Sequence, residues 1–298
     1  MKKYHFTLVD VFTDEPFSGN QLAVFTEPAG LSAAQMQMIA KEFNFSEVTF
    51  VFPPKAKGAD HWVRIFTPHT ELPMAGHPTI GTAYVLSARA SRKRTRLTFE
   101  EGVGMIPLSI EFDRGKPGWI GMSQPLPRFG PTFNERNQVA KMLSIDDKAI
   151  VPHLPIEAVS CGVPFLFVPV KDLRSVQTIK FNLEVWDRIL KGKPFDNVFV
   201  FTREAVHKES FVHSRMFGPG VGVQEDPATG SASGPLGCYL AKHEVIHPSP
   251  RAEFVSEQGL EIGRPSSIRV SIGTDQGKIS EVVISGKCRK VGEGDIEL

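Results

Sequence analysis

Two short segments of the chain each place a titratable side chain beside a run of small residues. The string AGHPTIGTA carries His77 between a glycine and a proline, and the string DPATGSASG begins with Asp226. Proline is comfortable in the first turn of a helix, since the N–H that it lacks would have no partner there. Pro78 and Pro227 therefore predict two helices that begin in these segments, with His77 and Asp226 at or near the N-caps.

The small residues make these helix starts suited to a ligand. Glycine, serine and threonine are mediocre or poor helix formers, but they let another group approach the backbone closely. Free N–H groups at a helix start attract anions, especially carboxylates and phosphates. Two such starts that face one cleft can hold a small acid from both sides. The alternative is that the glycines only provide clearance for two tightly packed, buried helices.

A third candidate is Glu47, in the string FSEVTF. It lies just before a predicted strand whose other residues are largely apolar. A carboxylate in such a place can be an ordinary capping or edge residue. It can also be a general base whose pKa is raised by burial.

The elements that must position these residues occur twice. Arg64 and Arg215 are each followed two residues later by phenylalanine and four residues later by proline. The strand patterns around them also repeat, and each repeat ends in one of the small-residue segments. The predicted strands are 4–12, 19–25, 46–52 and 61–68 in the first half, and 156–170, 196–202 and 213–219 in the second. This repetition predicts two homologous α+β halves.

The division that we expect is an N-terminal lobe of residues 1–127 plus about 283–298 and a C-terminal lobe of residues 128–282. The active site is expected in the cleft between them. Proline-rich residues 113–155 are interpreted as the crossover, with a helix at 134–145.

Two further helices are predicted, at 31–43 and 181–192. Ser32 is the expected N-cap of the first, Gln35 completes its capping box, and Leu31 can pack on Met36. Gly192 is expected to end the second.

Composition favours a soluble protein of the cytoplasm. The 298 residues have a net charge of +1, which gives no general attraction to nucleic acid or to a membrane. No apolar run approaches the ~18 residues of a spanning helix, and the first residues read as a strand. The cysteines Cys161, Cys238 and Cys288 are odd in number and far apart, as expected in a reducing compartment without a disulfide framework.

Two other motifs are interpreted as non-functional. The string HEVIH at 243–247 matches a zinc-protease pattern, but Pro248 disfavours a helix there and no third histidine follows at the expected spacing. The basic run at 88–96 is expected at the end of the first small-residue helix, where cations complement the helix dipole. We therefore expect no metal site.

The assembled segments resemble the PhzF-like family of phenazine-biosynthesis isomerases, which has the diaminopimelate epimerase fold. The resemblance covers nearly the whole chain, including GNQLAVF, RIFTPHTELPMAGHPTIGTA and SRMFGPGVGVQEDPATGSASGPLGCYLAKH. It implies an α+β fold of two pseudo-symmetric lobes, each with a mixed β-sheet curled into a barrel around a central helix. It also implies a homodimer that uses no cofactor or metal.

The resemblance also implies roles for individual residues. In the phenazine enzyme a glutamate moves a proton between carbons of trans-2,3-dihydro-3-hydroxyanthranilate, and that glutamate matches Glu47. The catalytic histidine and aspartate match His77 and Asp226. The substrate-binding positions match Ser46, Gly76, Gly230 and Ser231. The expected function is therefore isomerisation of a small carboxylate.

The pattern departs from diaminopimelate epimerase, which uses two cysteines at the starts of the central helices. GHPT and DPATG occupy those places here, and Cys238 is expected in the core. A two-thiol racemase is therefore unsupported. The alternatives that stay open are a racemase or epimerase that uses Glu47 with another base, and a non-catalytic protein that binds small acids.

Overall fold

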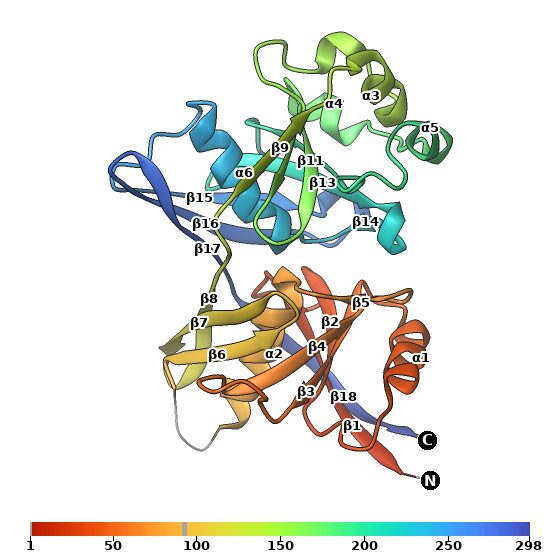
Figure 1. The fold of residues 1–298 in the computed structure, drawn as a ribbon, viewed down its shortest axis with the longest axis vertical. Helices are drawn as coiled ribbons and strands as arrows, with labels where there is room; N and C mark the ends of the chain where they lie inside the picture. Colours follow the sequence, from red (N-terminus) through yellow and green to blue (C-terminus); the bar gives the residue numbers. More distant parts are fainter. Residues whose placement is uncertain (1, 91–93) are drawn as a thin grey trace. The chain divides into compact units, whose positions relative to one another are not determined.

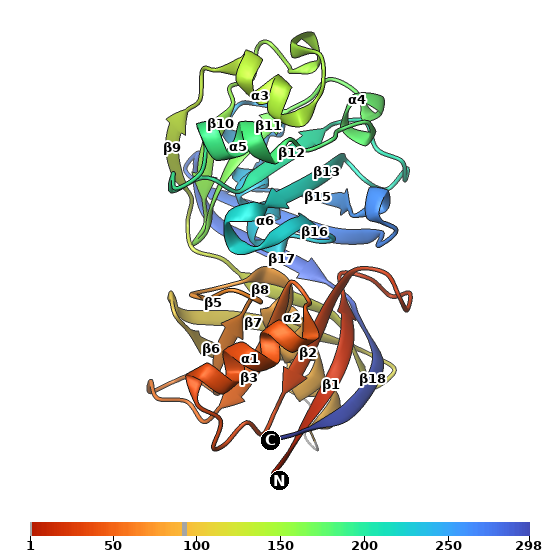
Figure 2. The same ribbon diagram turned by 90° about the vertical axis from the view of Figure 1, so that its right-hand side faces the viewer.

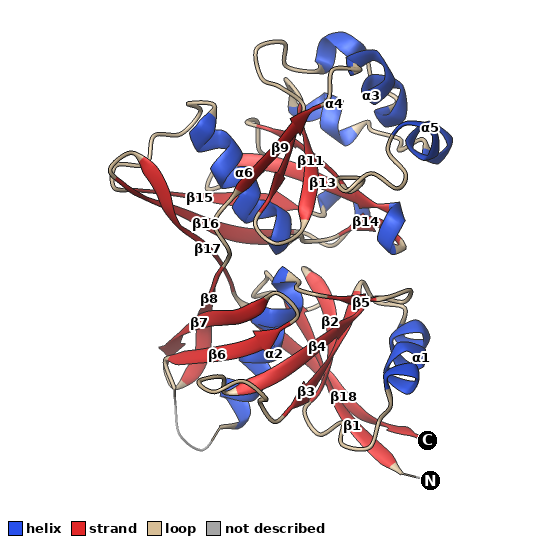
Figure 3. Ribbon diagram, in the orientation of Figure 1, coloured by secondary structure: helices blue, strands red, loops and turns tan. Residues whose placement is uncertain are grey.

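A computed structural model describes residues 2–90 and 94–298 of the chain. The chain divides into two compact units. Unit 1 comprises Met1–Gln124 and Val283–Leu298, and unit 2 comprises Pro125–Val282. Both units combine many strands with few helices, so the fold is α+β (Figure 3). Within the described residues, no helix is long and apolar enough to cross a membrane.

Unit 1 is a mixed sheet in the order β18-β1-β2-β3-β4-β6-β7-β8, with the short β5 beside β4 (Figure 1). The pairs β2/β3 and β4/β6 are parallel and the others antiparallel. The strands are β1 Lys3–Val11, β2 Asn20–Phe25, β3 Glu47–Phe52, β4 His61–Phe66, β5 Glu71–Leu72, β6 Arg96–Glu101, β7 Gly104–Asp113, β8 Lys116–Ser123 and β18 Cys288–Glu297. The helices are α1 Ala33–Phe43 and α2 Gly76–Arg89.

Unit 2 is a mixed sheet in the order β9-β10-β11-β12-β13-β15-β16, with β14 beside β13. The strands are β9 Arg128–Thr132, β10 Glu157–Ser160, β11 Pro164–Pro169, β12 Val198–Thr202, β13 Val212–Gly218, β14 Val223–Asp226, β15 Arg251–Gln258 and β16 Ser266–Asp275. The helices are α3 Arg136–Leu143, α4 Leu173–Gln177, α5 Leu183–Ile189 and α6 Gly230–Lys242, with short 3₁₀ turns at Asp147–Ala149, Pro219–Val221 and Leu260–Ile262. Strand β17, Lys278–Gly286, ends in unit 1, where its last residues pair with β8.

The two units repeat one order of strand pairings, as the predicted duplication requires. The run β1-β2-β3-β4-β6-β7 matches β10-β11-β12-β13-β15-β16 step by step, with parallel pairs at the same two steps. The two repeated arginines make equivalent contacts, because each binds a glutamate on the adjacent short strand. Arg64 on β4 forms two hydrogen bonds of 2.7 and 2.6 Å to Glu71 on β5, and Arg215 on β13 forms two of 2.8 Å to Glu225 on β14. Each fork holds the short strand that leads into α2 or α6.

The helices α2 and α6 pack against the sheets of their own units (Figures 1 and 2). A Cβ on Gly81 of α2 would lie 2.6 Å from Leu22 and 2.7 Å from Val11, and one on Gly237 of α6 would lie 2.7 Å from Ile272. These two glycines therefore allow the close packing of helix on sheet that was the alternative explanation for the glycines in these segments. In unit 1, α2 contacts β18 and β1 as well as β8, so the sheet curves around it. A closed barrel stays a prediction.

The local predictions for the other helices are largely confirmed. Ser32 caps α1, and Ser32 and Gln35 form the reciprocal capping box. Leu31 and Met36 are buried in the same apolar cluster. The helix predicted at 134–145 is α3. The helix predicted to run to Gly192 is α5, which ends at Ile189 instead.

The predicted starts of the two central helices need correction. Pro78 is the third residue of α2, not the first, because the helix begins at Gly76. Asp226 is not an N-cap: it ends β14, and α6 begins four residues later with Thr229 as its cap. The later start of α6 is caused by a residue distant in the sequence. Gln258 accepts a hydrogen bond from the Thr229 N–H and donates one to the Asp226 carbonyl. These bonds hold the intervening residues in an irregular turn.

The first turn of α2 rests on a buried acid that the sequence did not single out. The Thr79 hydroxyl lies 2.6 Å from the Ala75 carbonyl oxygen and 2.6 Å from Glu101 Oε1. A hydroxyl has one proton and the carbonyl can only accept, so both contacts are hydrogen bonds only if Glu101 is protonated and donates to Thr79. Burial raises the pKa of Glu101 to about 8, which agrees with a neutral acid.

The cysteines belong to the packed interior. Cys161, Cys238 and Cys288 are buried free thiols. The contact with the Cys238 thiol, together with burial, raises the pKa of Cys161, and burial raises the pKa of Cys288. Cys238 is a core residue of α6, as expected.

The close approach of α2 and α6 to their sheets generates a stability prediction. We expect Gly81→Ala and Gly237→Ala to lower the free energy of unfolding by about 1–3 kcal/mol, because overpacking outweighs the gain in helix propensity. Urea unfolding followed by circular dichroism measures the change. Gly292→Ala is the control, since its Cβ would meet Leu8 only at 3.7 Å. Wild-type stability in both helix variants would contradict the packing argument.

The neutral state of Glu101 generates a pH prediction. Its pKa is about 8 in the folded protein and about 4.5 when unfolded. Between these values the unfolded chain loses the proton and the folded chain keeps it, so this residue lowers stability as pH rises from 4.5 to 8. Glu101→Gln should remove that loss, which is on the order of 3–5 kcal/mol at pH 8.

Urea unfolding between pH 5 and pH 8 measures the difference between wild type and Glu101→Gln. The exposed Glu111→Gln serves as the control. Equal pH dependence in wild type and Glu101→Gln would show that Glu101 is ionised in the folded protein.

Candidate functional site

Glu47 and His77 lie together in unit 1. Glu47 is the first residue of β3 and His77 is the second residue of α2. The Oε2 atom of Glu47 is 3.3 Å from the Nε2 atom of His77, and the two side chains are 12% and 4% exposed. The carboxyl group that the sequence singled out is therefore largely enclosed and beside the predicted histidine.

The alternation of β3 aims Glu47 at α2. Glu47 and Thr49 are two residues apart on one strand, so their side chains share a face of the sheet. The Thr49 hydroxyl is 2.8 Å from the hydroxyl of Thr82 on α2, and both threonines are fully buried. This hydrogen bond fixes the face of β3 that turns toward the helix.

His77 is neutral. Burial lowers the pKa of its imidazole to about 3, against a smaller opposing effect from a hydrogen bond to the backbone of Gln21. Nε2 makes no hydrogen bond within the described part of the chain, so Nδ1 donates to Gln21 and Nε2 carries the lone pair. Two atoms that can both accept, Nε2 and the Glu47 oxygen, therefore face each other. If Glu47 were protonated on Oε2, its O–H could donate a hydrogen bond to Nε2 of His77.

The described helices differ in whether a side chain caps their first turn. Side chains of Ser32, Asp172 and Asn182 cap α1, α4 and α5. Among the residues that the structure describes, no side chain caps α2, α3 or α6, and none of these three helices has an acidic residue in its first turn. Gly76 opens α2 next to His77, and Ser46 precedes Glu47. The positive end of the α2 dipole is thus left without a protein carboxylate in its first turn.

The unit 2 candidates gather at the start of α6. Asp226 is buried at the end of β14, and its Oδ2 accepts a 2.5 Å hydrogen bond from the Thr229 hydroxyl. Gly230 and Ser231 are the first two residues of α6 and are buried. Gln258 donates to Thr229 Oγ1 at 2.9 Å as well as to the Asp226 carbonyl. No sequence signal marked Gln258, because it acts on a segment about thirty residues earlier.

The site residues are therefore divided between the two units. Ser46, Glu47, Gly76 and His77 belong to unit 1. Asp226, Gly230 and Ser231 belong to unit 2. Their participation in one site stays a prediction.

The HEVIH string is not on a helix. His243 is the C-cap of α6, and Glu244 has a left-handed backbone with φ of 58°. His243 Nε2 is hydrogen-bonded to Glu157 at 2.7 Å. Across residues 2–90 and 94–298, no three histidine, cysteine or acidic side chains are grouped to hold a metal ion. In the basic run, Arg89 ends α2 as expected, and residues 91–93 lie outside the described part.

The chain is similar to known proteins over nearly its whole length. Residues 9–294 match the PhzC-PhzF family model, described as phenazine biosynthesis-like protein. An uncharacterized isomerase of Clostridium acetobutylicum is 32% identical over 303 residues, covering 100% of this chain and 99% of the relative. The trans-2,3-dihydro-3-hydroxyanthranilate isomerase of Pseudomonas aeruginosa is 35% identical over 291 residues, covering 98% of each chain.

Solved structures of the same family are also similar to this chain. A PhzF family protein of Bacillus anthracis has a TM-score of 0.91 and 30% identity over the full length of both chains. A hydroxyproline epimerase of Agrobacterium vitis, at 12% identity and a TM-score of 0.65, covers 99% of this chain and 92% of its own and shows a likeness of fold alone. The resemblance carried by the sequence motifs is thereby confirmed, and the chain belongs to the phenazine biosynthesis-like PhzC-PhzF family.

Proposed function

We propose that this protein is an isomerase that moves a proton between two carbons of a small carboxylate, with Glu47 as the general acid and base. The observation that carries the proposal is the enclosed contact between Glu47 and the neutral His77. Relatives named as isomerases support the reaction class.

The proposed step uses one carboxyl group twice. Glu47 as a carboxylate removes a proton from one carbon, holds it, and returns it to another carbon of the same ligand. While Glu47 holds the proton, its O–H can donate to Nε2 of His77, which stabilises the loaded state. A positioned acid–base group of this kind typically contributes about 10²–10⁴-fold in rate. The low exposure of Glu47 slows exchange of the held proton with water without excluding it, so part of the returned hydrogen comes from the solvent.

The helix starts are proposed to bind the ligand. Backbone N–H groups near Gly76 would bind the carboxylate from unit 1, and those near Gly230 and Ser231 would act from unit 2. Asp226 would orient an amino or hydroxyl group, and Ser46 would bind the ligand beside Glu47. We therefore propose that both units contribute to a single active site and that the protein is a homodimer.

The first substrate to test is trans-2,3-dihydro-3-hydroxyanthranilate, because relatives from three Pseudomonas species carry the name of its isomerase. Identity near one third leaves the ligand itself open. An assay in deuterated water covers other small carboxylates, since a returned proton that has exchanged with solvent labels the product.

Glu47→Gln tests the central role. We expect turnover to fall by at least about 10²-fold, while affinity for the ligand changes little, because the amide keeps the shape and loses the proton carrier. Turnover is followed by ultraviolet absorbance and by deuterium incorporation, and affinity by calorimetry. The exposed Glu42→Gln on α1 is the matched control. Wild-type turnover in Glu47→Gln would refute the proposal.

His77→Gln tests the neutral imidazole. We expect kcat to fall about ten-fold with little change in KM, because a hydrogen bond made only to the loaded carboxyl is weakened. The pH–rate profile between pH 5 and pH 8 should keep its shape, because the pKa of His77 is about 3 and the ring stays neutral across that range. The exposed His207→Gln is the control. A limb of the profile that disappears only in His77→Gln would show that the ring titrates there.

A further inference from the structure

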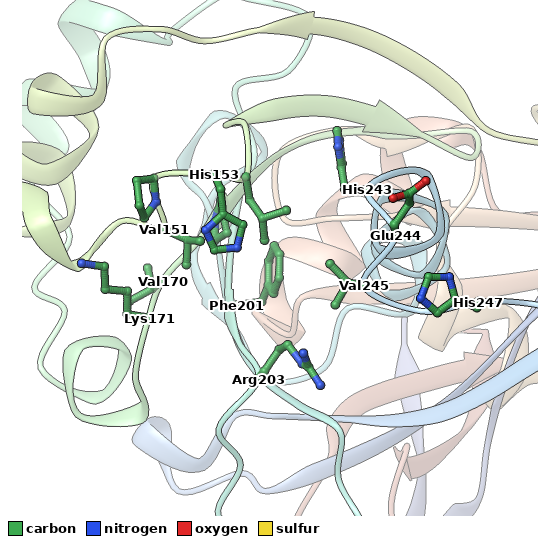
Figure 4. A pocket seen from close by; sticks show the side chains of 13 residues that line it. Val151, His153, Val170, Lys171, Phe201, Arg203, His243, Glu244, Val245 and His247 are labelled. Atoms are coloured by element: carbon green, nitrogen blue, oxygen red, sulfur yellow. The ribbon is translucent and has the colours of Figure 1, made fainter.

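Unit 2 contains a hollow that is separate from every residue assigned above to catalysis or substrate binding. Its volume is about 960 Å³, and all of its lining residues belong to unit 2. Figure 4 shows it from close by. We call it the unit 2 hollow. A volume of this size is that of a small-molecule site.

The unit 2 hollow lies where two adjacent parallel strands end. Strands β11 and β12 pair in parallel, with Pro169 opposite Phe201. The wall is completed by residues 151–154 and by the segment 243–247 that follows α6. The carboxyl ends of parallel strands are recurrent binding places, because side chains from successive loops converge there.

The floor of the hollow is apolar. Leu154, Val170 and Phe201 line it and are buried. Val245 lies beside Phe201 near the centre of the view in Figure 4. An apolar or aromatic ligand body would remove this surface from water.

The rim is mostly basic. Lys171 and Arg203 each follow the paired residues Pro169 and Phe201 by two positions, so the register brings both cations to the same edge. In the part of the chain that the structure describes, neither has a carboxylate partner within ion-pair distance. The Arg203 guanidinium packs 5.0 Å from the Phe211 ring.

Two histidines add to this rim, His153 and His247, and Figure 4 shows Val245 between Phe201 and His247, with Arg203 below Phe201. The opposing charge in the lining is Glu244. His243 also lines the hollow but is held by Glu157. With neutral histidines the rim therefore carries a net positive charge, which favours an anion.

We propose that the unit 2 hollow binds a small organic anion, a carboxylate with an apolar or aromatic body, whose charged group contacts Arg203. The apolar floor takes the body of the ligand and the guanidinium takes the carboxylate. This assigns His243–His247, the zinc-like string, to the wall of an anion site. The proposal does not depend on the isomerase function, because it shares no residue with that site.

The experiment uses the full chain and 2-naphthoate as the probe, with binding measured by calorimetry. Arg203→Glu should weaken binding at least about ten-fold, because a charge-assisted contact becomes a repulsion. The exposed Lys208→Glu makes the same charge change elsewhere in unit 2 and should leave binding unchanged. The neutral isostere 2-naphthol should bind more weakly than naphthoate and should be insensitive to Arg203→Glu.

A second variant tests the cavity itself. Val245→Trp should fill the hollow and abolish naphthoate binding, with circular dichroism verifying that the variant is folded. Naphthoate affinity that is unchanged in both Arg203→Glu and Val245→Trp would overturn the proposal. It would also be overturned if the variants altered the sedimentation of the protein and left binding intact, because the hollow would then be a contact between copies of the chain.

Discussion

The contact between Glu47 and His77 is the interaction on which the proposed chemistry depends. A carboxyl oxygen lies 3.3 Å from an unprotonated imidazole nitrogen, and both side chains have little access to water. One proton can therefore bind between these two atoms. Much of unit 1 serves to keep those two atoms opposite each other. The Thr49–Thr82 hydrogen bond fixes the face of β3, and Gly81 lets α2 approach the sheet. The Arg64–Glu71 fork holds the strand that leads into α2. The contact is therefore held by packing and hydrogen bonds within unit 1, in contrast to a flexible pair on a surface.

The duplicated fold places different chemistry on equivalent positions. Phe50 pairs with Arg64 as Val200 pairs with Arg215, and this register makes Asn197 the counterpart of Glu47. Asn197 is buried, and its amide cannot carry a proton at ordinary pH. In the repeated strings Asp226 takes the place of His77, so unit 2 has no imidazole at this point. This asymmetry favours one proton carrier in unit 1, in contrast to a pair of equivalent bases related by the duplication.

Sequence patterns predicted what local forces decide. The capping box of α1, the strand that became β3 and the repeat of Arg64 and Arg215 were all predicted, because each depends on neighbours in the chain or on a repeated string. The predicted start of α6 was wrong, because Gln258 and Ser266, which are distant in the sequence, form hydrogen bonds with the Asp226–Thr229 segment. Glu101 was missed for a related reason. Its neutral state follows from burial beneath α2, which the string FEEG does not reveal.

The charge states around α2 suit the binding of an anion. A helix start attracts negative charge, and a protein carboxylate placed there would compete with an anionic ligand. Glu101 is close to the first turn through Thr79, yet burial keeps it neutral. His77 is also neutral, so it neither repels a cation nor forms a fixed ion pair with Glu47. Apart from Glu47, which contacts His77 and is the proposed base, the α2 dipole is then the main fixed field at Gly76, and it would attract a ligand carboxylate. Neutral Glu101 and His77 beside this helix start thus favour the anion position and the proton transfer that we propose for this site.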